Sequence, residues 1–321
     1  MQLREIAWPG VATLVWDGDE LLDVTNGQRA HADGPPALSR FNMTYQFDRA
    51  ISLRSGATHW AVAYTNRNTK ALLMKNGTID RELNRSFYCA NDYDYPISIG
   101  PAASGGVLVA HCPHAFNLLE IEDAETGATL DSLESEAMEF HSRLSFSPDG
   151  RFLSDAGWFW HPLSGAAVFQ TVSGDGGSLQ FDRNPVFRTE FSETHELDSM
   201  AFLGNTELTV SFVADHEGMK RGPGQLCIWS LTHGRWKSRV EVNEPIGMMM
   251  PWKEFVVSFY DHPKLISLTS GEVVHRWDGI YSGKQLGPIE LGDPPPPPIA
   301  LDPVHGRFAV ANSKIVTLVT L

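Results

Sequence analysis

The sequence predicts an all-β protein built as a ring of repeated four-stranded sheets, on the strength of three observations. The helical periodicity of apolar residues is nearly absent, and short β-rich runs are separated by Gly, Pro, Asn and Asp. Short apolar runs repeatedly end in a polar turn with glycine, as in "LLMKNGTI" and "LISLTSGE". Two more strand-like segments precede each turn, which gives a unit of about 40–45 residues. Such units predict a β-propeller, because a twisted four-stranded sheet buries both faces only against neighbouring sheets.

The glycine turns are expected to join the third and fourth strands (c and d) of each unit. Hairpin turns need a positive φ, which costs glycine nothing. The turn glycines are Gly27, Gly77, Gly127, Gly165, Gly234 and Gly271.

One unit, "SRLSFSPDGRFLSDAGWFWHPLSGAAVFQTV", contains every predicted element. A tight turn at Pro148-Asp149-Gly150 joins its first two strands, and Ser164-Gly165 is the predicted c-to-d turn. The predicted strands a to d are 142–147, 151–157, 158–163 and 166–172.

Seven units are expected in one domain that spans residues 1–321. The last unit, "PPIALDPVHGRFAVANSKIVTLVTL", supplies only three strands before the sequence ends. The N-terminal "QLREIAW" could supply its outer strand, which would close the ring and remove an exposed sheet edge. The first unit would then be short of a strand, so a six-bladed ring is the alternative.

Two stretches, "SFSPDGRFL" and "ALDPVHGRFAVA", resemble WD40 or YVTN-type propeller repeats, and "IWSLTHG" resembles the end of their third strand. The only literal Trp-Asp pair, Trp277-Asp278, follows a fourth strand, and the usual Gly-His before strand a is missing, although His141 stands near that place. The resemblance therefore implies the fold and not the WD40 hydrogen-bond tetrad. The whole chain also resembles an uncharacterised bacterial propeller family, which implies no activity.

Composition narrows the classes of partner. Acidic residues outnumber basic ones by 39 to 25 and the net charge is −14, which disfavours nucleic acid and anionic membranes. No secretory signal and no run of 18 apolar residues is present, and three cysteines predict no disulfide framework, so a cytoplasmic location is expected. No P-loop or nucleophile elbow occurs, and no cofactor is expected.

In a propeller the d-to-a and b-to-c connections share one face, here called the top. Three d-to-a links stand out: "SFYCANDYDYPI", a link over 173–197, and a link over 278–298 that ends in five prolines. Long links are often functional, and the prolines are expected to act as a stiff spacer into a strand over 299–302. The first link places Tyr88, Asp92, Tyr93 and Asp94 on the top face.

The b-to-c turns bring further polar and aromatic residues to the same face. They are His111 and His114 in "VLVAHCPHAF", Trp158 in "SDAGWFWHP", Asp215 and His216 in "SFVADHEG", and Asp261 and His262 in "SFYDHPKL". Histidine and carboxylate ligands from several blades could bind a metal ion, but turn formation, packing and a ligand surface explain the same residues, and no metal site is assigned.

The sequence therefore predicts a non-enzymatic interaction module that binds a protein or peptide through a loop-rich top face. The alternative is an enzyme, a hydrolase or lyase with top-face His and Asp residues near the central channel, assisted by a metal ion or not. The methionines Met248–Met250 are expected to fill the channel wall.

Overall fold

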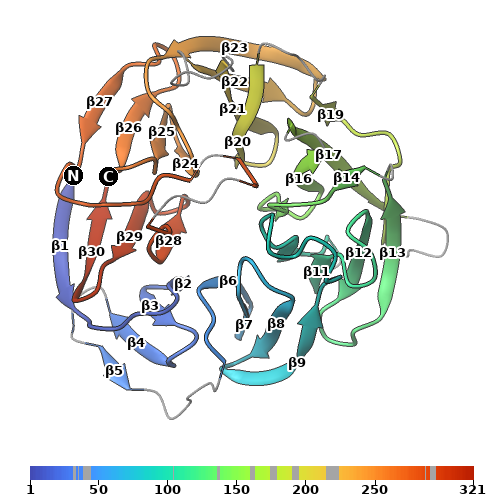
Figure 1. Ribbon diagram of the computed structural model, residues 1–321, viewed down its shortest axis with the longest axis horizontal. Helices are drawn as coiled ribbons and strands as arrows, with labels where there is room; N and C mark the ends of the chain where they lie inside the picture. The colour runs from blue at the N-terminus through green and yellow to red at the C-terminus, as the bar shows by residue number, and fades with distance from the viewer. Residues whose placement is uncertain are drawn as a thin grey trace.

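The computed structural model contains a ring of seven blades, each a β-sheet radiating from a central axis (Figure 1). It describes residues 1–31, 34, 36–38, 45–103, 105–135, 138–159, 163–173, 179–189, 195–214, 224–285, 287–289 and 294–321. Every element found in this part of the chain is a strand, and the described residues include no helix that could cross a membrane. The predicted all-β propeller with seven blades is thus confirmed.

The first three blades are regular antiparallel meanders that run from the centre outward. They consist of β2 (Val15–Asp17), β3 (Glu20–Asp23), β4 (Gln28–His31) and β5 (Ala37–Leu38); β6 (Arg49–Ser55), β7 (Thr58–Tyr64), β8 (Lys70–Lys75) and β9 (Thr78–Asn84); and β10 (Ile97–Pro101), β11 (Val107–His111), β12 (Leu118–Asp123) and β13 (Thr129–Glu134).

Blades 5 to 7 follow the same order from the centre outward. They consist of β20 (His195–Leu203), β21 (Glu207–Ala214), β22 (Gly224–Ser230) and β23 (Arg235–Val242); β24 (Met249–Trp252), β25 (Phe255–Ser258), β26 (Lys264–Ser267) and β27 (Val273–Arg276); and β28 (Ile299–Asp302), β29 (Arg307–Ala311), β30 (Ile315–Thr320) and β1 (Gln2–Ala7).

The N-terminal strand closes the ring. β1 pairs antiparallel with β30, in register from Gln2 opposite Thr320 to Ala7 opposite Ile315, and Figure 1 shows the two chain ends side by side. This confirms the predicted closure. The expectation that blade 1 would be short of a strand is wrong, because the three-residue strand β2 occupies its innermost position.

Blade 4 departs from the prediction. Two short inner strands, β14 (Glu139–Phe140) and β15 (Ser145–Phe146), pair with β16 (Phe152–Phe159), and β16 pairs with one long strand, β17 (Leu163–Ser173). The predicted strand c (158–163) is therefore not a separate strand, because Trp158 and Phe159 end β16 and Leu163 begins β17. Gly165 lies opposite Gly157 inside the ladder rather than at a turn. A glycine inside a strand marks close backbone approach as readily as a turn, and a Cβ on Gly157 would lie 2.7 Å from the Phe140 carbonyl oxygen.

The outer position of blade 4 comes from the segment predicted as a long top link. β18 (Leu179–Phe181) and β19 (Phe187–Arg188) both pair with β17, and β20 already begins at His195. Four of the predicted c-to-d turn glycines are confirmed, because Gly77, Gly127, Gly234 and Gly271 each lie between a third and a fourth strand with a positive φ of 57–77°. Gly27 also has a positive φ, of 66°, but it lies between β3 and β4, so its prediction as a c-to-d turn is wrong and it belongs to a b-to-c turn.

The core is divided into seven apolar clusters, and each lies between two neighbouring blades. Between blades 2 and 3, for example, Trp60 and Val62 pack against Ile97 and Val109. Each sheet is thus covered on both faces, as expected for a ring of repeated sheets.

The innermost strands surround a central cavity, and the long link between β27 and β28 runs inward over the top of the ring (Figure 1). Met248, Met249 and Met250 line this cavity, as predicted for a channel strand. The prolines 294–298 lead directly into β28, which begins at Ile299 as expected. The top face therefore has a rim of blade connections and a centre covered by one link.

Candidate functional site

The link between blades 2 and 3 is shaped around one buried arginine. Arg85 donates to the carbonyl oxygens of Asn68 at 2.9 Å, of Tyr93 at 3.2 Å, and of Ala90. Its guanidinium also lies over the Tyr93 ring, 4.4 Å from the ring centre. Burial lowers the Arg85 pKa from its ordinary value, and the negative charge of nearby groups opposes this shift. One side chain thus satisfies the carbonyl groups of a non-regular loop.

This loop delivers aromatic residues to the top of blades 3 and 4. The Phe140 ring stacks on Phe116 at 4.1 Å between centroids and lies 4.5 Å from Trp158. Tyr93 meets Phe140 edge-on at 5.2 Å, and the Tyr88 ring lies 5.2 Å from Phe116. We call these five residues the aromatic cluster. Tyr93 is fully buried, and burial raises its pKa well above the usual range.

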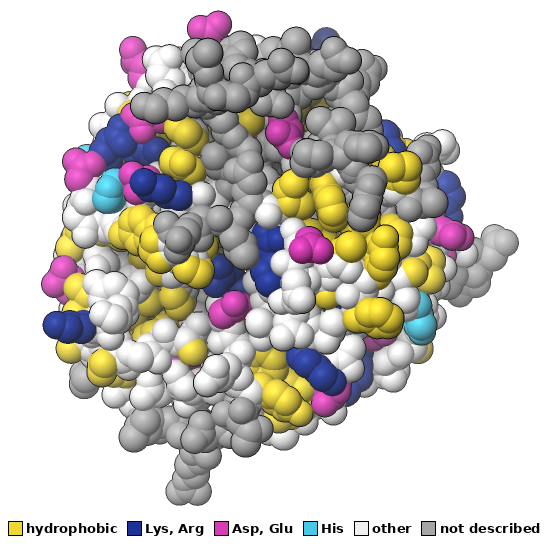
Figure 2. Space-filling view, viewed as in Figure 1, with side chains coloured by type: hydrophobic (Ala, Val, Ile, Leu, Met, Phe, Trp, Pro, Cys, Tyr) yellow, Lys and Arg dark blue, Asp and Glu magenta, His cyan; other side chains and the backbone are white. Residues whose placement is uncertain are grey.

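The outer side of the aromatic cluster is exposed. Phe87 is 87% exposed, Tyr88 47% and Met138 46%. We call these three residues the aromatic patch. Figure 2 views the top face and shows hydrophobic side chains gathered over blades 3 and 4. Large apolar side chains held in place but left in water mark interaction surfaces.

Asp94 lies at the centre of a polar hub at the channel mouth. Its carboxylate accepts hydrogen bonds from Asn66 Nδ2 at 2.7 Å, Arg143 Nε at 2.7 Å and Gln285 Nε2 at 2.8 Å. Arg67 Nη2 lies 3.3 Å from the same group. Burial lowers the Arg67 pKa and the Asp94 charge opposes this, so the hub is a buried charged network.

The hub holds the covering link in place. Arg143 donates to the Gly287 carbonyl, Arg67 donates to the Pro288 carbonyl at 3.1 Å, and the Asp94 backbone N–H donates to the same Pro288 oxygen at 2.9 Å. Gly287 N–H donates to the Asp198 carbonyl at 3.2 Å. The link therefore connects blades 2, 4 and 5 across the top of the channel.

The two predicted histidines of blade 3 have different environments. His111 is the last residue of β11 and is buried, with its Nε2 2.8 Å from Glu122 Oε1. His114 lies in the b-to-c turn with its side chain mostly exposed, and its Nδ1 is 2.6 Å from Glu120 Oε1. Of the two, only His114 is open to a partner.

Asp261 and His262 lie in the b-to-c turn of blade 6. The Asp261 N–H donates to the Gly283 carbonyl at 2.5 Å, and His262 Nδ1 lies 2.8 Å from the Ile280 carbonyl oxygen. Both residues therefore hold the start of the covering link. Asp92 is exposed on the link between blades 2 and 3, and Asp215 and His216 lie outside the described residues.

The predicted histidines come from different blades, His111 and His114 from blade 3 and His262 from blade 6. Within the described ranges, no group of three or more His, Cys, Asp or Glu side chains is placed to hold a metal ion. The described residues of the top face therefore offer no set of side chains that could bind a metal ion.

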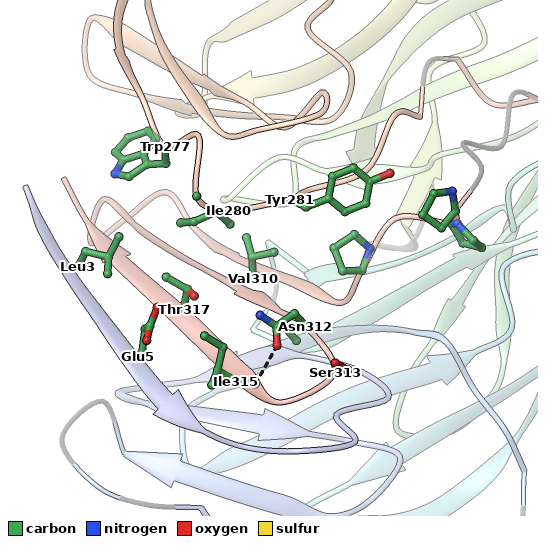
Figure 3. A pocket seen from close by; sticks show the side chains of 15 residues that line it. Leu3, Glu5, Trp277, Ile280, Tyr281, Val310, Asn312, Ser313, Ile315 and Thr317 are labelled. Atoms are coloured by element: carbon green, nitrogen blue, oxygen red, sulfur yellow. Dashed lines mark hydrogen bonds between the residues drawn. The ribbon is translucent and has the colours of Figure 1, made fainter.

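A groove of about 650 Å³ opens between blades 6 and 7 (Figure 3). Trp277, Ile280 and Tyr281 from the covering link form one wall, and Val310 and Ile315 from blade 7 form another. Asn312 Oδ1 accepts the Ile315 N–H at 2.9 Å and fixes the turn between β29 and β30 at the groove's edge. The groove is mainly apolar, and it lies across the ring from the aromatic patch.

Comparison with known proteins gives similarity in structure but not in sequence. No protein-family model matches the chain, and no curated protein matches it. A chain of the hydrazine synthase of Kuenenia stuttgartiensis superposes with a TM-score of 0.62 at 13% identity, covering 98% of this chain and 96% of that one. A chain of the mitotic checkpoint complex gives a TM-score of 0.59 at 10% identity and covers 99% and 91%.

The WD40 β-propeller domain of Doa1 superposes with a TM-score of 0.58 at 9% identity, over 97% of this chain and 93% of that domain. The chain is a WD40-like β-propeller. At these identities the similarity establishes the fold alone, and the activity of each neighbour remains that neighbour's own.

Within this WD40-like propeller, His141 forms a buried pair with Asp155 that could not be predicted from the sequence. His141 Nδ1 lies 2.5 Å from Asp155 Oδ2, and Asp155 Oδ1 accepts the Ser142 N–H at 3.0 Å. Burial alone would lower the His141 pKa, but the charge of Asp155 and their hydrogen bond outweigh it and raise the pKa. The pair fixes the inner edge of blade 4 beneath the aromatic cluster.

Sequence reasoning selected Asp94 and missed most of its partners. Asn66 and Gln285 are ordinary amides in connections, and Arg143 has a left-handed backbone with φ of 43°. No local spacing relates these residues, because the ring closure brings them together from blades 2, 4 and 6.

Proposed function

We propose that this WD40-like propeller is a protein-interaction module that binds a protein or peptide partner on its top face. The aromatic patch anchors that partner. The observation that carries the proposal is Phe87, an aromatic side chain that is 87% exposed and directly precedes Tyr88 of the aromatic cluster in the chain. Burying such a side chain against a partner is a common source of binding energy.

The cluster beneath the patch supports this use. A rigid platform loses little side-chain entropy on binding, and Tyr88 is already oriented by Phe116 and Phe140. Tyr93 and His111 are buried, so their proposed part is to hold the surface. His114 and Asp92 are exposed and offer polar contacts at the edge of the patch.

One of the similar structures is a chain of the mitotic checkpoint complex, so a propeller with this fold takes part in a multiprotein assembly there. That likeness supports an interaction role in general terms. The partner proposed here is a protein segment that presents apolar or aromatic side chains, since the patch is apolar and the chain carries a net charge of −14.

The test compares partner capture by three immobilised forms of the full chain. In the patch variant, Phe87→Ser and Tyr88→Ser remove the exposed rings. In the groove variant, Tyr281→Ala changes an exposed aromatic residue across the ring. We expect partners bound by the unchanged chain to be lost by the patch variant, with affinity reduced at least about 30-fold, and retained by the groove variant.

Equal capture by the patch variant and the unchanged chain would contradict the placement of the site. Loss of capture only in the groove variant would move the site to the groove between blades 6 and 7. Thermal melting of all three forms serves as the folding control. A fourth form with Phe87→Ser alone should keep its stability within about 0.5 kcal/mol, because Phe87 is exposed, whereas Tyr88→Ser also removes contacts with Phe116 and Phe140.

A further inference from the structure

The central channel contains a cavity of about 460 Å³ beneath the polar hub. The hub residues Asp94, Arg143 and Gln285 line its upper end, and Phe146, Pro148 and Pro303 line its lower end. Pockets for small organic molecules fall in this range of volume, and they combine apolar walls with a few fixed polar groups.

The hydrogen-bonding groups of the hub are already used. The Asp94 carboxylate accepts from Asn66, Arg143 and Gln285, and the guanidinium of Arg143 also donates to the carbonyl groups of Asp198 and Gly287. A ligand in the cavity therefore gains little from the hub itself.

Two donors at the upper end of the cavity do not bind the Asp94 carboxylate. Arg49 on β6 and Tyr64 on β7 are direct cross-strand partners, and both line the cavity. Arg49 donates only to carbonyl oxygens, of Asp48 at 2.7 Å and Pro296 at 3.4 Å, and no described carboxylate lies within 4.0 Å of its guanidinium. The Tyr64 hydroxyl makes no hydrogen bond with the described residues, and the charged groups of Arg49, Asp94 and Asp48 lie near it.

The rest of the cavity wall is mainly apolar, with Ser145 and Ser199 as its polar residues. It comes from the innermost strands of several blades, which turn hydrophobic side chains toward the axis. The main contributors are Ile51, Ile97, Phe146, Met200, Met249 and Leu301. An unbranched or aromatic apolar body fits such a wall, and methionine side chains adapt to its shape.

The charge at this site differs in sign from that of the whole chain. Among the residues that line the cavity, Arg49 and Arg143 are cationic and only Asp94 is anionic. Arg143 and Arg67 neutralise Asp94, so the guanidinium of Arg49 is the charge left for a ligand. A carboxylate would accept from Arg49 and from the Tyr64 hydroxyl together.

We propose that the central channel binds a small monocarboxylate with an apolar body of medium length. Its carboxylate is held by Arg49 and Tyr64, and its body lies along the methionine-rich wall toward Phe146 and Leu301. This site is separate from the aromatic patch and does not depend on the proposed partner.

The first experiment is isothermal titration calorimetry of the full chain with octanoate. Octanoate is expected to bind, acetate at least about 100-fold more weakly, since each buried methylene contributes about four-fold to affinity. Octylamine, with the same body and opposite charge, is expected not to bind. Absence of octanoate binding, or equal binding of octylamine, would overturn the proposal.

Two variants locate the carboxylate. Arg49→Gln should weaken octanoate binding about 10- to 100-fold, and Tyr64→Phe about 3- to 10-fold, because charged hydrogen bonds contribute more than neutral ones. Arg151→Gln is the matched control, since Arg151 is an exposed arginine paired with Asp149 outside the channel. If Arg49→Gln fails to fold, the affinity of Tyr64→Phe for octanoate tests the carboxylate site, because this change removes a single hydroxyl. Unchanged affinity in Tyr64→Phe then counts against the site.

A crystal grown with 8-bromooctanoate gives the position directly. The bromine anomalous peak should lie in the channel near Phe146, Met249 and Leu301, and a peak only outside the channel would refute the assignment. Tighter binding of a peptide with a free C-terminal carboxylate than of octanoate would also refute it. The patch variant should bind octanoate normally, so failure here and failure of the partner proposal are distinguishable.

Discussion

Replacing Asp94 by Asn tests whether the polar hub holds the top of the propeller together. The change keeps the side-chain shape but removes the carboxylate that Arg143 and Arg67 contact, which is the only one within reach of them among the described residues. Asp94 is 5% exposed, and leaving a buried partner charge unpaired costs about 3–5 kcal/mol. Because about a fifth of the Arg143 side chain stays exposed, at 21%, we expect about 3 kcal/mol. For a chain of 321 residues that lowers Tm by about 4–5 °C.

The assay is differential scanning calorimetry, joined with hydrogen–deuterium exchange of the peptides that cover 283–289. Loss of the Asp94 contacts should raise exchange in those peptides, because Gln285 binds the carboxylate and the Asp94 N–H binds the Pro288 carbonyl. Asp92→Asn is the control, an exposed carboxylate two positions away that should change stability by less than about 0.5 kcal/mol. A Tm for Asp94→Asn within about 1 °C of the parent, roughly the effect of one surface change, would show that the hub does not stabilise the top of the propeller.

Three further predictions concern the ring. Gly150→Ala should destabilise by more than about 3 kcal/mol, since φ is +70° and the new Cβ would lie 1.7 Å from the Pro101 carbonyl oxygen. Gly10→Ala, with φ of +74° and no atom within 4 Å of the Cβ, should lower the free energy of unfolding by only about 1 kcal/mol. Urea titrations of the two variants measure this difference. Ile6→Ala should cost about 2–4 kcal/mol because Ile6 is 4% exposed on the closing strand β1, whereas an equal effect from exposed Glu5→Ala would argue against that closure. The His141 pKa is raised in the folded state, so the contribution of its pair with Asp155 is fully present below pH 6.5 and lost as pH rises through the folded value. His141→Asn should therefore lower the free energy of unfolding more at pH 6 than at pH 8.5, and a pH-independent difference would count against the charged pair.

The repeat pattern predicted most of the ring because the turn chemistry recurs in sequence. Positive-φ glycines mark four of the predicted c-to-d turns, and the missing strand of the last unit pointed to the N-terminal strand that does complete it. The pattern failed in blade 4, where Gly165 pairs inside a long strand. Glycine serves both turns and close strand contacts, and one sequence does not distinguish these uses.

The site was harder to predict than the fold. Tyr88, Tyr93 and Trp158 were selected as top-face residues, and they do meet in one aromatic cluster. The sequence gives no sign that Arg85 shapes the loop or that Gln285 reaches Asp94, because those contacts depend on the path of links across the ring. Contacts between residues 191 positions apart have no local signal.

Photo-crosslinking at Phe87 tests the central claim, that the top face binds a partner through the aromatic patch. A benzoylphenylalanine at position 87 stands where the native ring is 87% exposed, and one at Val304 stands in the a-to-b turn of the opposite face, where the native side chain is 78% exposed. We expect a discrete crosslinked protein from position 87 and none from position 304. Equal crosslinking at both positions, or crosslinking only at 304, would contradict it.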